Sequence, residues 1–221
     1  MLDKFQKDRM PNKRLSRISA GPSDYVKTKK RLPHFNFIFW WAFSIVFCIT
    51  PNVLAGEQEI WRALSSKGNI ALIRHTIAPG VGDPPEFSIN DCETQRNLSE
   101  EGRLQAKRLG DRFRKNGIET AKIFSSQWCR CLETASLLKL GKVDELPILN
   151  SFYRRYERED EQTKGLERWI VRQKINQPIV LITHQVNITA LTGIFPAEGE
   201  LVAIKVAENG KIQVRGTIEN N

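Results

Sequence analysis

The sequence predicts one α/β domain in which helices cover both faces of a largely parallel sheet, giving a three-layer sandwich. Short apolar runs typical of buried strands alternate with segments of helical periodicity over residues 57–221. Such alternation is typical of parallel sheets with crossover helices. The last two runs alternate apolar and polar side chains around Asn209-Gly210, a dipeptide typical of tight hairpin turns. We therefore expect an antiparallel hairpin at the end of the domain.

The first part of the domain predicts a helix, a strand and a loop. Residues 57–66 place apolar side chains on one helical face, and residues 69–74 (NIALIR) form a compact apolar run of strand type. Residues 78–85 are rich in Gly and Pro, which is typical of a loop.

A long helix should follow, beginning at Ser99. Ser is a favoured helix cap, and the acidic side chains after it suit the positive end of the helix dipole. Asn116-Gly117 is the expected stop. The apolar positions at helical spacing are Leu104, Ala106, Leu109 and Phe113.

The second half of the domain alternates in the same way. Residues 178–183 (PIVLIT) form the clearest buried strand, because the run is apolar and rich in β-branched side chains. Residues 146–149 are a further candidate strand. The remaining predicted elements are strands at 122–124, 201–207 and 211–216 and helices at 128–140, 161–173 and 187–192.

The positive charge of the chain is concentrated before the domain. Residues 1–33 hold ten Lys or Arg and three acids, about seven of the nine net positive charges. The alkaline pI therefore belongs to this tail, which we expect to lack a fold, and indicates no nucleic-acid partner for the domain.

Residues 34–55 contain an apolar run, 35–54, directly after the basic tail. The run is short for a spanning helix and suits the apolar region of a signal peptide, and Val53 to Ala55 suits cleavage before Gly56. We expect export to a periplasmic or extracellular location. Two outcomes stay open for the segment: cleavage as a signal peptide or retention as a membrane anchor.

Three cysteines belong to the domain. Cys129 and Cys131 are two residues apart on a predicted helix, so they face different directions and should not pair. In an oxidising compartment we expect a disulfide that joins Cys92 to either Cys129 or Cys131. No metal site is expected, because the Cys-x-Cys pair has no second ligand pair at zinc spacing.

Histidine and arginine side chains follow the predicted strands. His75 comes directly after Arg74 at the end of one strand, His184 ends another, and Arg130 follows a third. The carboxyl ends of parallel strands share one edge of the sheet, where ligands bind, so these side chains should meet. A neutral imidazole can attack phosphorus, and arginine forks bind phosphate oxygens in pairs. The pattern indicates phosphoryl transfer.

Four segments, taken together and in order, resemble the histidine phosphatase superfamily, which includes phosphoglycerate mutases and phosphohistidine phosphatases. Residues 72–76 (LIRHT) resemble the strand-Arg-His-Gly motif, and residues 97–106 (NLSEEGRLQA) resemble Leu-Ser/Thr-x-x-Gly-x-x-Gln-Ala. Residues 125–135 (SSQWCRCLETA) resemble Ser-x-x-x-Arg-x-x-x-Thr-Ala, and residues 180–184 (VLITH) resemble strand-Gly/Thr-His. The resemblance implies a phosphoglycerate mutase-like fold.

The resemblance also implies a role for each residue of the pattern. His75 would be the catalytic nucleophile, Arg74 and Arg130 would bind the phosphate during catalysis, and His184 would be the second histidine of the phosphate pocket. Arg96 matches an arginine that the smaller phosphohistidine phosphatases place in this pocket. The second histidine would be protonated and would donate to the phosphate oxygens.

Two positions depart from the family pattern. Thr76 replaces the usual glycine, which would narrow the floor of the pocket. Ser151 stands after Leu149-Asn150, where mutase-like members have a glutamate proton donor. Asp83 is one candidate donor, although Gly-Asp-Pro is also typical of a turn. The others belong to an acidic run equally typical of a solvated face: Glu157, Glu159, Asp160 and Glu161.

We therefore expect a phosphomonoesterase of the histidine acid-phosphatase type, acting through a phosphohistidine intermediate without metal or other cofactor. The alternatives are a non-catalytic phosphate-binding module, which the missing glutamate favours, and a phosphomutase. The expected partner is a phosphorylated small molecule or phospho-group, with no nucleic acid, and membrane contact only through the N-terminal segment. Residues 78–93 and 151–162 should define the substrate.

Overall fold

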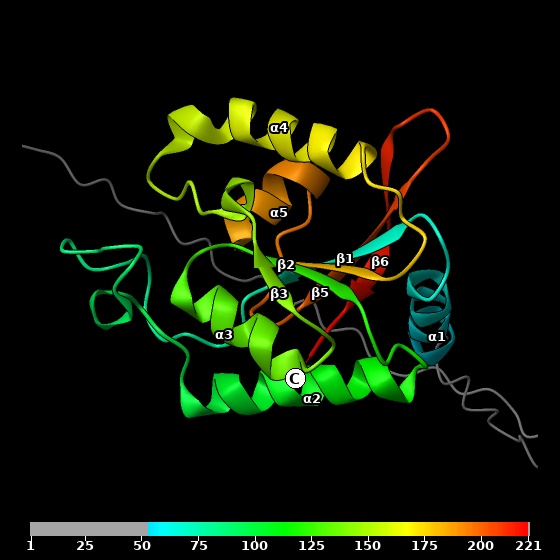
Figure 1. Cartoon of the computed structure of the whole chain (residues 1–221), viewed down its shortest axis with the longest axis horizontal. Helices are drawn as coiled ribbons and strands as arrows, with labels where there is room; N and C mark the ends of the chain where they lie inside the picture. The colour runs from blue at the N-terminus through cyan, green and yellow to red at the C-terminus, as the bar shows by residue number, and fades with distance from the viewer. Residues whose placement is uncertain (1–52, 221) are drawn as a thin grey trace, which may run out of the picture. The chain divides into compact units, whose positions relative to one another are not determined.

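The computed structural model describes residues 53–220, which form a six-stranded sheet with helices on both faces (Figure 1). The strand order is β3-β2-β4-β1-β5-β6. The strands are β1 (Asn69–Arg74), β2 (Lys122–Ser125), β3 (Val143–Glu145), β4 (Ile179–Thr183), β5 (Leu201–Val206) and β6 (Ile212–Ile218). The block β3-β2-β4-β1 is parallel, and the C-terminal hairpin β5-β6 joins it antiparallel, so the sheet is mixed.

Helices α2 and α3 cover one face of the sheet, and α4 and α5 cover the other (Figure 1). The helix α1 packs into the same apolar cluster as α2 and α3. The α-helices are α1 (Val53–Leu64), α2 (Glu100–Lys115), α3 (Cys129–Leu138), α4 (Glu159–Val171) and α5 (Gln185–Thr192). Three short 3-10 helices complete the described chain: η1 (Cys92–Thr94), η2 (Pro147–Leu149) and η3 (Tyr156–Arg158).

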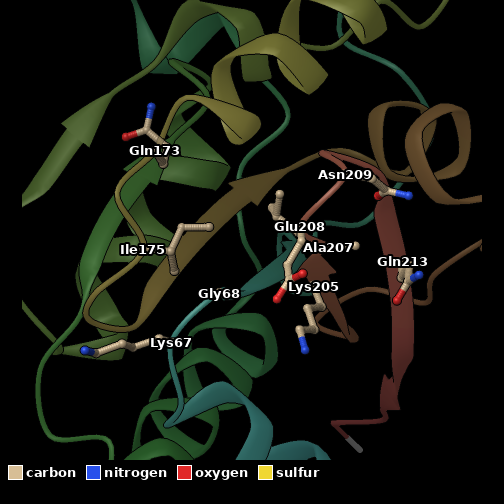
Figure 2. Close-up of a pocket in the computed structure, with 10 residues that line it drawn as sticks. Lys67, Gly68, Gln173, Ile175, Lys205, Ala207, Glu208, Asn209 and Gln213 are labelled. Carbon is tan, nitrogen blue, oxygen red and sulfur yellow. The ribbon is translucent and has the colours of Figure 1, made fainter.

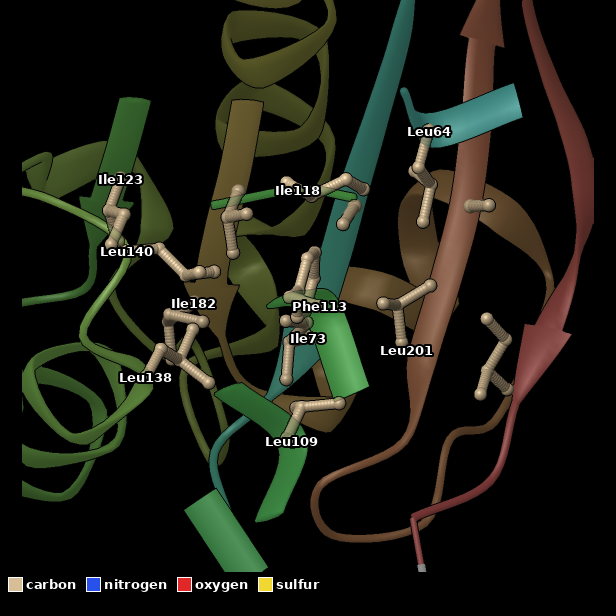
Figure 3. Packing of buried hydrophobic residues seen from close by; sticks show 14 of the residues in the cluster. Leu64, Ile73, Leu109, Phe113, Ile118, Ile123, Leu138, Leu140, Ile182 and Leu201 are labelled. Atoms are coloured by element: carbon tan, nitrogen blue, oxygen red, sulfur yellow. The ribbon is translucent and has the colours of Figure 1, made fainter. Parts of the chain in front are cut away.

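The strand periodicity of two divides the core between the faces. In β1, Ala71 and Ile73 join the cluster under α2 and α3, whereas Ile70 and Leu72 join the cluster under α4 and α5. Phe113 of α2 lies among the first set (Figure 3). Burial of a side chain of this size contributes roughly 1.5–3 kcal/mol. The strand is therefore fixed from both sides, and so is the segment that follows it.

The helix α2 begins and ends where the sequence predicts. The Ser99 side chain accepts a hydrogen bond from the Gly102 amide at 3.0 Å, and Asn116 caps the C-terminus. The prediction was wrong for Leu104, which is 47 % exposed. The position lies off the stripe that the other apolar side chains of the helix form. A Cβ on Gly102 would lie 2.1 Å from the carbonyl oxygen of Ile77, so this position requires glycine.

The candidate strand at 146–149 is wrong. Residues Pro147–Leu149 form η2, and the strand β3 comes earlier, at Val143–Glu145. Proline lacks the amide hydrogen that a ladder requires and suits the first turn of a helix. Apolar composition alone did not distinguish the two.

The predictions for residues 1–33 and 34–55 concern segments that lie almost entirely outside the described residues. The basic tail and the apolar run 35–54, as an export signal or an anchor, remain predictions. Between residues 53 and 220, no helix combines the length and the apolar character needed to cross a membrane.

Candidate active site

A cavity of about 340 Å³ lies at the carboxyl ends of β1, β2 and β4. The register pairs Arg74 with Thr183 across β1 and β4, so the residues after both strands emerge side by side. All five residues that the sequence assigned to a phosphate pocket line this cavity: Arg74, His75, Arg96, Arg130 and His184.

A second, larger groove of about 780 Å³ lies near the amino ends of β1 and β4, opposite the ends that border the first cavity (Figure 2). Gly68 before β1 and Ile175 before β4 line it, together with Lys67 and Lys205. Its lining contains neither histidine nor cysteine. Volume alone would favour this groove, but the smaller cavity holds the nucleophilic and phosphate-binding side chains, so we place the chemistry there.

His75 is oriented by the backbone on both sides. Its amide donates to the Thr183 carbonyl at 3.0 Å, and its Nδ1 lies 2.8 Å from the Thr76 carbonyl oxygen. Because a carbonyl can only accept, Nδ1 carries the proton of the neutral ring and Nε2 keeps its lone pair. Burial, with the nearby charge of Arg130, lowers the pKa of His75 well below its usual value. His75 is therefore an unprotonated nucleophile at neutral pH.

His184 lies beside His75, with ring centroids 5.6 Å apart. Its Nε2 is 2.8 Å from the Ser126 hydroxyl and 3.5 Å from the Cys131 sulfur. Burial, followed by the charge of Arg130, lowers its pKa well below the usual value. The ring is thus neutral in this structure, whereas the sequence predicted a protonated donor. A bound phosphate dianion would favour the protonated form, because an opposite charge close by stabilises it.

Two arginines of the cavity share one carboxylate. Glu198 lies 3.4 Å from Arg74 and 3.6 Å from Arg96. Arg74 also donates to the Pro196 carbonyl at 3.0 Å. Arg96 donates through Nε to the Gly82 carbonyl at 2.9 Å and through a terminal nitrogen to the Ala78 carbonyl.

Arg130 is only 3 % exposed and forms an ion pair with Asp83 at 2.6 Å. The second Asp83 oxygen accepts from the other terminal nitrogen of Arg130 at 3.1 Å and from the Trp128 indole at 2.9 Å. Among the described residues, the buried Nε groups of Arg74 and Arg130 have no hydrogen-bond partner. Unpaired buried donors are costly, and these two are also inaccessible to solvent, so they are a cost of packing the arginines at this position.

Asp83 lies in the cavity, but as an ionised acceptor. Burial alone would raise its pKa, yet the hydrogen bond and charge of Arg130 outweigh burial and lower the pKa. A carboxylate in this state accepts protons poorly and has none to donate. Asp83, which the sequence suggested as a proton donor, is therefore the counter-ion of Arg130 in this structure.

Glu157, the other candidate donor named for a catalytic role, does not line the cavity. It is exposed and lies 3.2 Å from Arg155, with its pKa lowered by a backbone hydrogen bond and this neighbour. Ser151 lines the cavity where a glutamate was expected. Of the described carboxyl groups, Asp83 is thus the one in the cavity lining.

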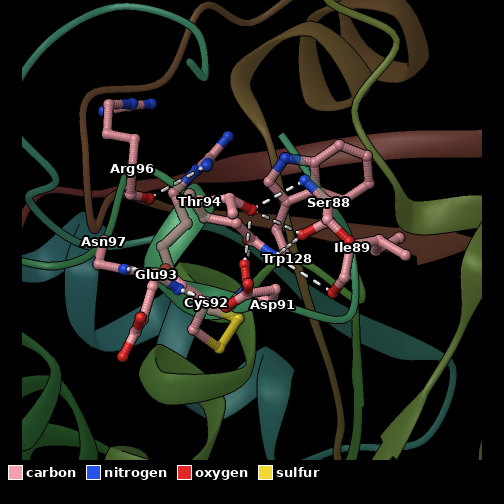
Figure 4. The surroundings of a disulfide bond; sticks show 12 residues. Ser88, Ile89, Asp91, Cys92, Glu93, Thr94, Arg96, Asn97 and Trp128 are labelled. Carbon is pink, nitrogen blue, oxygen red and sulfur yellow. Dashed lines mark hydrogen bonds between the residues drawn. A yellow bond between two sulfur atoms is a disulfide. The ribbon is translucent and has the colours of Figure 1, made fainter. Parts of the chain in front are cut away.

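A disulfide joins Cys92 to Cys129, one of the two pairings that the sequence left open (Figure 4). It connects η1, next to Arg96, to the first residue of α3, next to Arg130. Cys131 is a free buried thiol, and burial raises its pKa to about 12. Cys131 is therefore a protonated, unreactive neighbour of the second histidine.

Thr76 does not narrow the floor of the pocket. Its hydroxyl lies 3.1 Å from the Thr134 hydroxyl of α3, and its amide donates to the same oxygen. The side chain is fully buried and absent from the cavity lining. The departure from glycine is accommodated by α3 rather than by the pocket.

Sequence reasoning missed several residues of the site. Glu198 lies more than a hundred residues from the arginines that it pairs with, and no local pattern marks it. The stretch 151–162 was predicted to define the substrate, but the only side chains named in it as candidate site residues were acids, as possible proton donors. Three arginines from this stretch line the cavity: Arg154, Arg155 and Arg158. Among the described residues, no cluster of His, Cys, Asp and Glu is arranged to hold a metal ion.

Residues 72–152 match the family model of the histidine phosphatase superfamily (branch 1). The mitochondrial serine/threonine-protein phosphatase Pgam5 of Drosophila virilis is 37 % identical over 93 residues, 42 % of this chain and 31 % of that protein. Pgam5 of Drosophila ananassae is 30 % identical over 105 residues, 47 % of this chain and 36 % of that protein. The chain spans about a third of the length of these curated relatives.

Solved structures share the fold at low sequence identity. The protein histidine phosphatase SixA complexed with tungstate has a TM-score of 0.52 at 13 % identity, over 69 % of this chain and 97 % of that one. A mutant phosphoserine phosphatase from Entamoeba histolytica in complex with phosphoserine has a TM-score of 0.51 at 13 % identity, over 67 % and 95 %. The family match over residues 72–152, the shared fold and the four sequence motifs agree, and together they support the histidine phosphatase superfamily for the part of the chain that they cover.

Proposed function

We propose that the chain is a phosphomonoesterase that hydrolyses its substrate through a phosphohistidine at His75. The observation that carries the proposal is the free Nε2 lone pair of a buried, neutral imidazole in a cavity lined by three buried or half-buried arginines. The two curated relatives and the two solved structures described above are phosphatases by name, which supports phosphatase chemistry at this site.

The first step transfers the phosphoryl group to the histidine. Nε2 of His75 attacks phosphorus, and the bond from phosphorus to the leaving oxygen breaks, with its electron pair going to that oxygen. Negative charge on the peripheral oxygens is stabilised by Arg74, Arg96 and Arg130, which are fixed before the substrate arrives. Protonated His184 donates to the same oxygens.

The second step releases phosphate. Water attacks the phosphorus of the phosphohistidine, the phosphorus–nitrogen bond breaks, and its electron pair returns to Nε2. The proton lost by the attacking water leaves with the inorganic phosphate, and His75 is again neutral with Nδ1 bonded to Thr76. The cycle therefore requires no metal or redox cofactor to balance.

The leaving group receives little help from this site. The Asp83 carboxylate in the cavity is ionised and paired with Arg130, so it has no proton to give. The departing oxygen must therefore take a proton from water or leave as an anion. We infer that the enzyme favours leaving groups that are stable as anions or easily protonated, such as an aryl oxide or an imidazole. The rate should fall steeply for simple alkyl phosphates.

Rapid acid quench with radiolabelled phosphate ester tests the proposal. We expect stoichiometric, acid-labile label on the protein and turnover of p-nitrophenyl phosphate, with both abolished in His75→Ala. Arg215→Gln, an exposed arginine of β6 outside the cavity, is the matched control and should be unchanged.

Two results would replace the proposal by its rivals. Phosphate binding without labelled protein or His75-dependent turnover would indicate a non-catalytic binding module. Quantitative transfer of the label to a second ester rather than to water would indicate a phosphomutase.

We also propose that the domain is exported, and either released by cleavage before Gly56 or held by residues 35–54. The Cys92–Cys129 disulfide supports this, because disulfides are rare in reducing compartments. Cell fractionation with mass measurement of the mature N-terminus tests it. Full-length chain with reduced cysteines in the cytosolic fraction would contradict the proposal.

A further inference from the structure

Three arginines beyond the phosphate pocket line the same cavity. Arg154, Arg155 and Arg158 lie between Asn150 and the start of α4, and all three are exposed. The proposed chemistry at His75 makes no use of them. Their position on the wall of a catalytic cavity gives them access to the part of a substrate that does not react.

Gly82 connects these arginines to the phosphate pocket. Its carbonyl accepts from Nε of Arg96 at 2.9 Å. A Cβ built on the same glycine would lie 3.7 Å from Cζ of Arg154. The Arg96 and Arg154 guanidinium groups are thus separated by about the width of one residue. A substrate whose phosphate contacts Arg96 can place a second group against Arg154 without leaving the cavity.

The backbone holds Arg154 in an unusual conformation. Its φ is +63°, in the left-handed region that few residues other than glycine adopt. The Phe152–Arg155 turn, closed by a 2.7 Å hydrogen bond, and the packing of the Arg154 guanidinium 5.5 Å over the Tyr153 ring fix it there. The left-handed conformation is unfavourable for a residue with a side chain, and such strained residues concentrate at binding and catalytic sites.

The two sets of arginines differ in their counter-ions. In the phosphate pocket, Asp83 binds Arg130 and Glu198 lies against Arg74 and Arg96. On the other wall, Glu157 pairs with Arg155, but no ion pair among the described residues involves Arg154 or Arg158. The charge of Arg158 also acts on Glu157 and lowers its pKa, so Arg154 is the arginine of this wall that is least compensated by the described carboxylates.

We propose that Arg154 and Arg158, with Arg155 beside them, form a second anion subsite, and that the substrate is a small phosphate ester carrying a second phosphate group. The inference rests on the proposed function and names its substrate class. The reacting phosphate lies against His75, and the second phosphate binds the arginines after Asn150. Guanidinium forks suit both groups, because each binds two phosphate oxygens at once.

A competition assay measures the subsite without depending on turnover of the ligand. Hydrolysis of p-nitrophenyl phosphate, which has one phosphate, is inhibited with a matched pair: fructose 6-phosphate and fructose 1,6-bisphosphate. We expect the bisphosphate to bind the purified chain at least tenfold more tightly. Two interchangeable phosphates without a second subsite would give only about a twofold statistical advantage.

The variant Arg154→Gly/Arg158→Gln removes two guanidinium groups while keeping the turn, because glycine adopts the left-handed conformation freely. We expect its bisphosphate preference, measured as the ratio of the two inhibition constants, to fall to about twofold, because a general change in the cavity would affect both inhibitors alike. Arg215→Gln should keep the full preference. The tenfold advantage should also shrink on raising the salt concentration, because the contacts are exposed.

The outcomes separate the subsite from the proposed function. If the parent shows His75-dependent turnover but no more than twofold bisphosphate preference, or if the double variant keeps its preference, the subsite is refuted and the phosphatase stands. If no ester shows His75-dependent turnover, the proposed function fails first. Direct binding of the same pair by calorimetry then still decides whether the subsite exists.

Discussion

Removal of the Cys92–Cys129 disulfide should lower both the stability of the domain and its affinity for phosphate. The two cysteines are 37 residues apart, and closing a loop of this length in the unfolded chain is worth about 4 kcal/mol in the chain-entropy model. The bond also ties the segment that carries Arg96 to the helix that carries Arg130. Without it, the two segments are held together by noncovalent contacts alone, among them the hydrogen bonds from Arg130 to the Arg96 carbonyl and from the Cys129 amide to the Gln95 side chain.

The double variant Cys92→Ser/Cys129→Ser tests this directly. Urea unfolding followed by tryptophan fluorescence should give a free energy of unfolding about 2–4 kcal/mol lower than the parent. Inhibition by inorganic phosphate should weaken several-fold. A reducing agent should bring the parent to the level of the double variant and leave the double variant unchanged, since Cys131, the remaining cysteine of the domain, is already a free thiol. A loss below about 1 kcal/mol, or an equal response of both proteins to reduction, would refute the reasoning.

Three further predictions follow from the cavity and its supports. The pKa values of both domain histidines, His75 and His184, are lowered in the folded state, so neither imidazole should titrate near pH 6.5 by NMR. The free energy of unfolding should decrease as the pH falls below 6.5, because the unfolded chain then binds more protons than the folded one. Titration of both rings near pH 6.5 would contradict this. Asp83→Asn should lower the inhibition constant of inorganic phosphate about tenfold, roughly 1.4 kcal/mol, because it removes the carboxylate that competes with phosphate for Arg130. Weaker inhibition would show instead that the Asp83 carboxylate positions Arg130. Gly102→Ala should destabilise the domain by about 1–3 kcal/mol and reduce kcat, because its Cβ would meet the backbone after the nucleophile at 2.1 Å. The control is Gly56→Ala in α1, where nothing lies within 4 Å, and which should be neutral or stabilising in the same urea unfolding assay.

The part of the site that sequence reasoning located lies at the ends of buried strands. Apolar runs fixed β1 and β4, and the residues directly after them, His75 and His184, had to emerge at one edge of a parallel sheet. Arg130, in the first turn of α3, follows β2 in the same way, and the family motifs added Arg96, which precedes the Ser99 cap of α2. Local pattern sufficed because each of these residues is held by its own element.

The rest of the site depends on contacts between distant segments. Glu198 has no sequence signal, because its role arises where the loop before β5 passes the end of β1. The sequence around Asp83 is equally consistent with a turn residue and with a proton donor. Only the 2.6 Å distance from its carboxylate to Arg130 identifies it as a counter-ion. The strand predicted at 146–149 failed for a different reason: Pro147 determines the backbone, and apolar composition does not report it.

The carboxylates explain how three arginines share so small a cavity and why the pocket should discriminate between anions. Burial and mutual repulsion lower the pKa values of Arg74 and Arg96, while Glu198 opposes the shift for both. Asp83 accepts hydrogen bonds from both terminal nitrogens of Arg130 through its two oxygens and balances the charge of this arginine. A monocarboxylate ligand could only replace what Asp83 already supplies, so it would gain little.

A phosphate dianion brings a second charge and a third oxygen, and guanidinium groups bind phosphate oxygens in pairs. The same arginine charges lower the pKa of His75 and keep its lone pair available before the substrate arrives. Substitution of Arg130 by glutamine would therefore weaken phosphate binding and also raise the pKa of His75. The second effect is measurable by NMR in the empty enzyme, and an unchanged pKa there would show that burial alone keeps the nucleophile neutral.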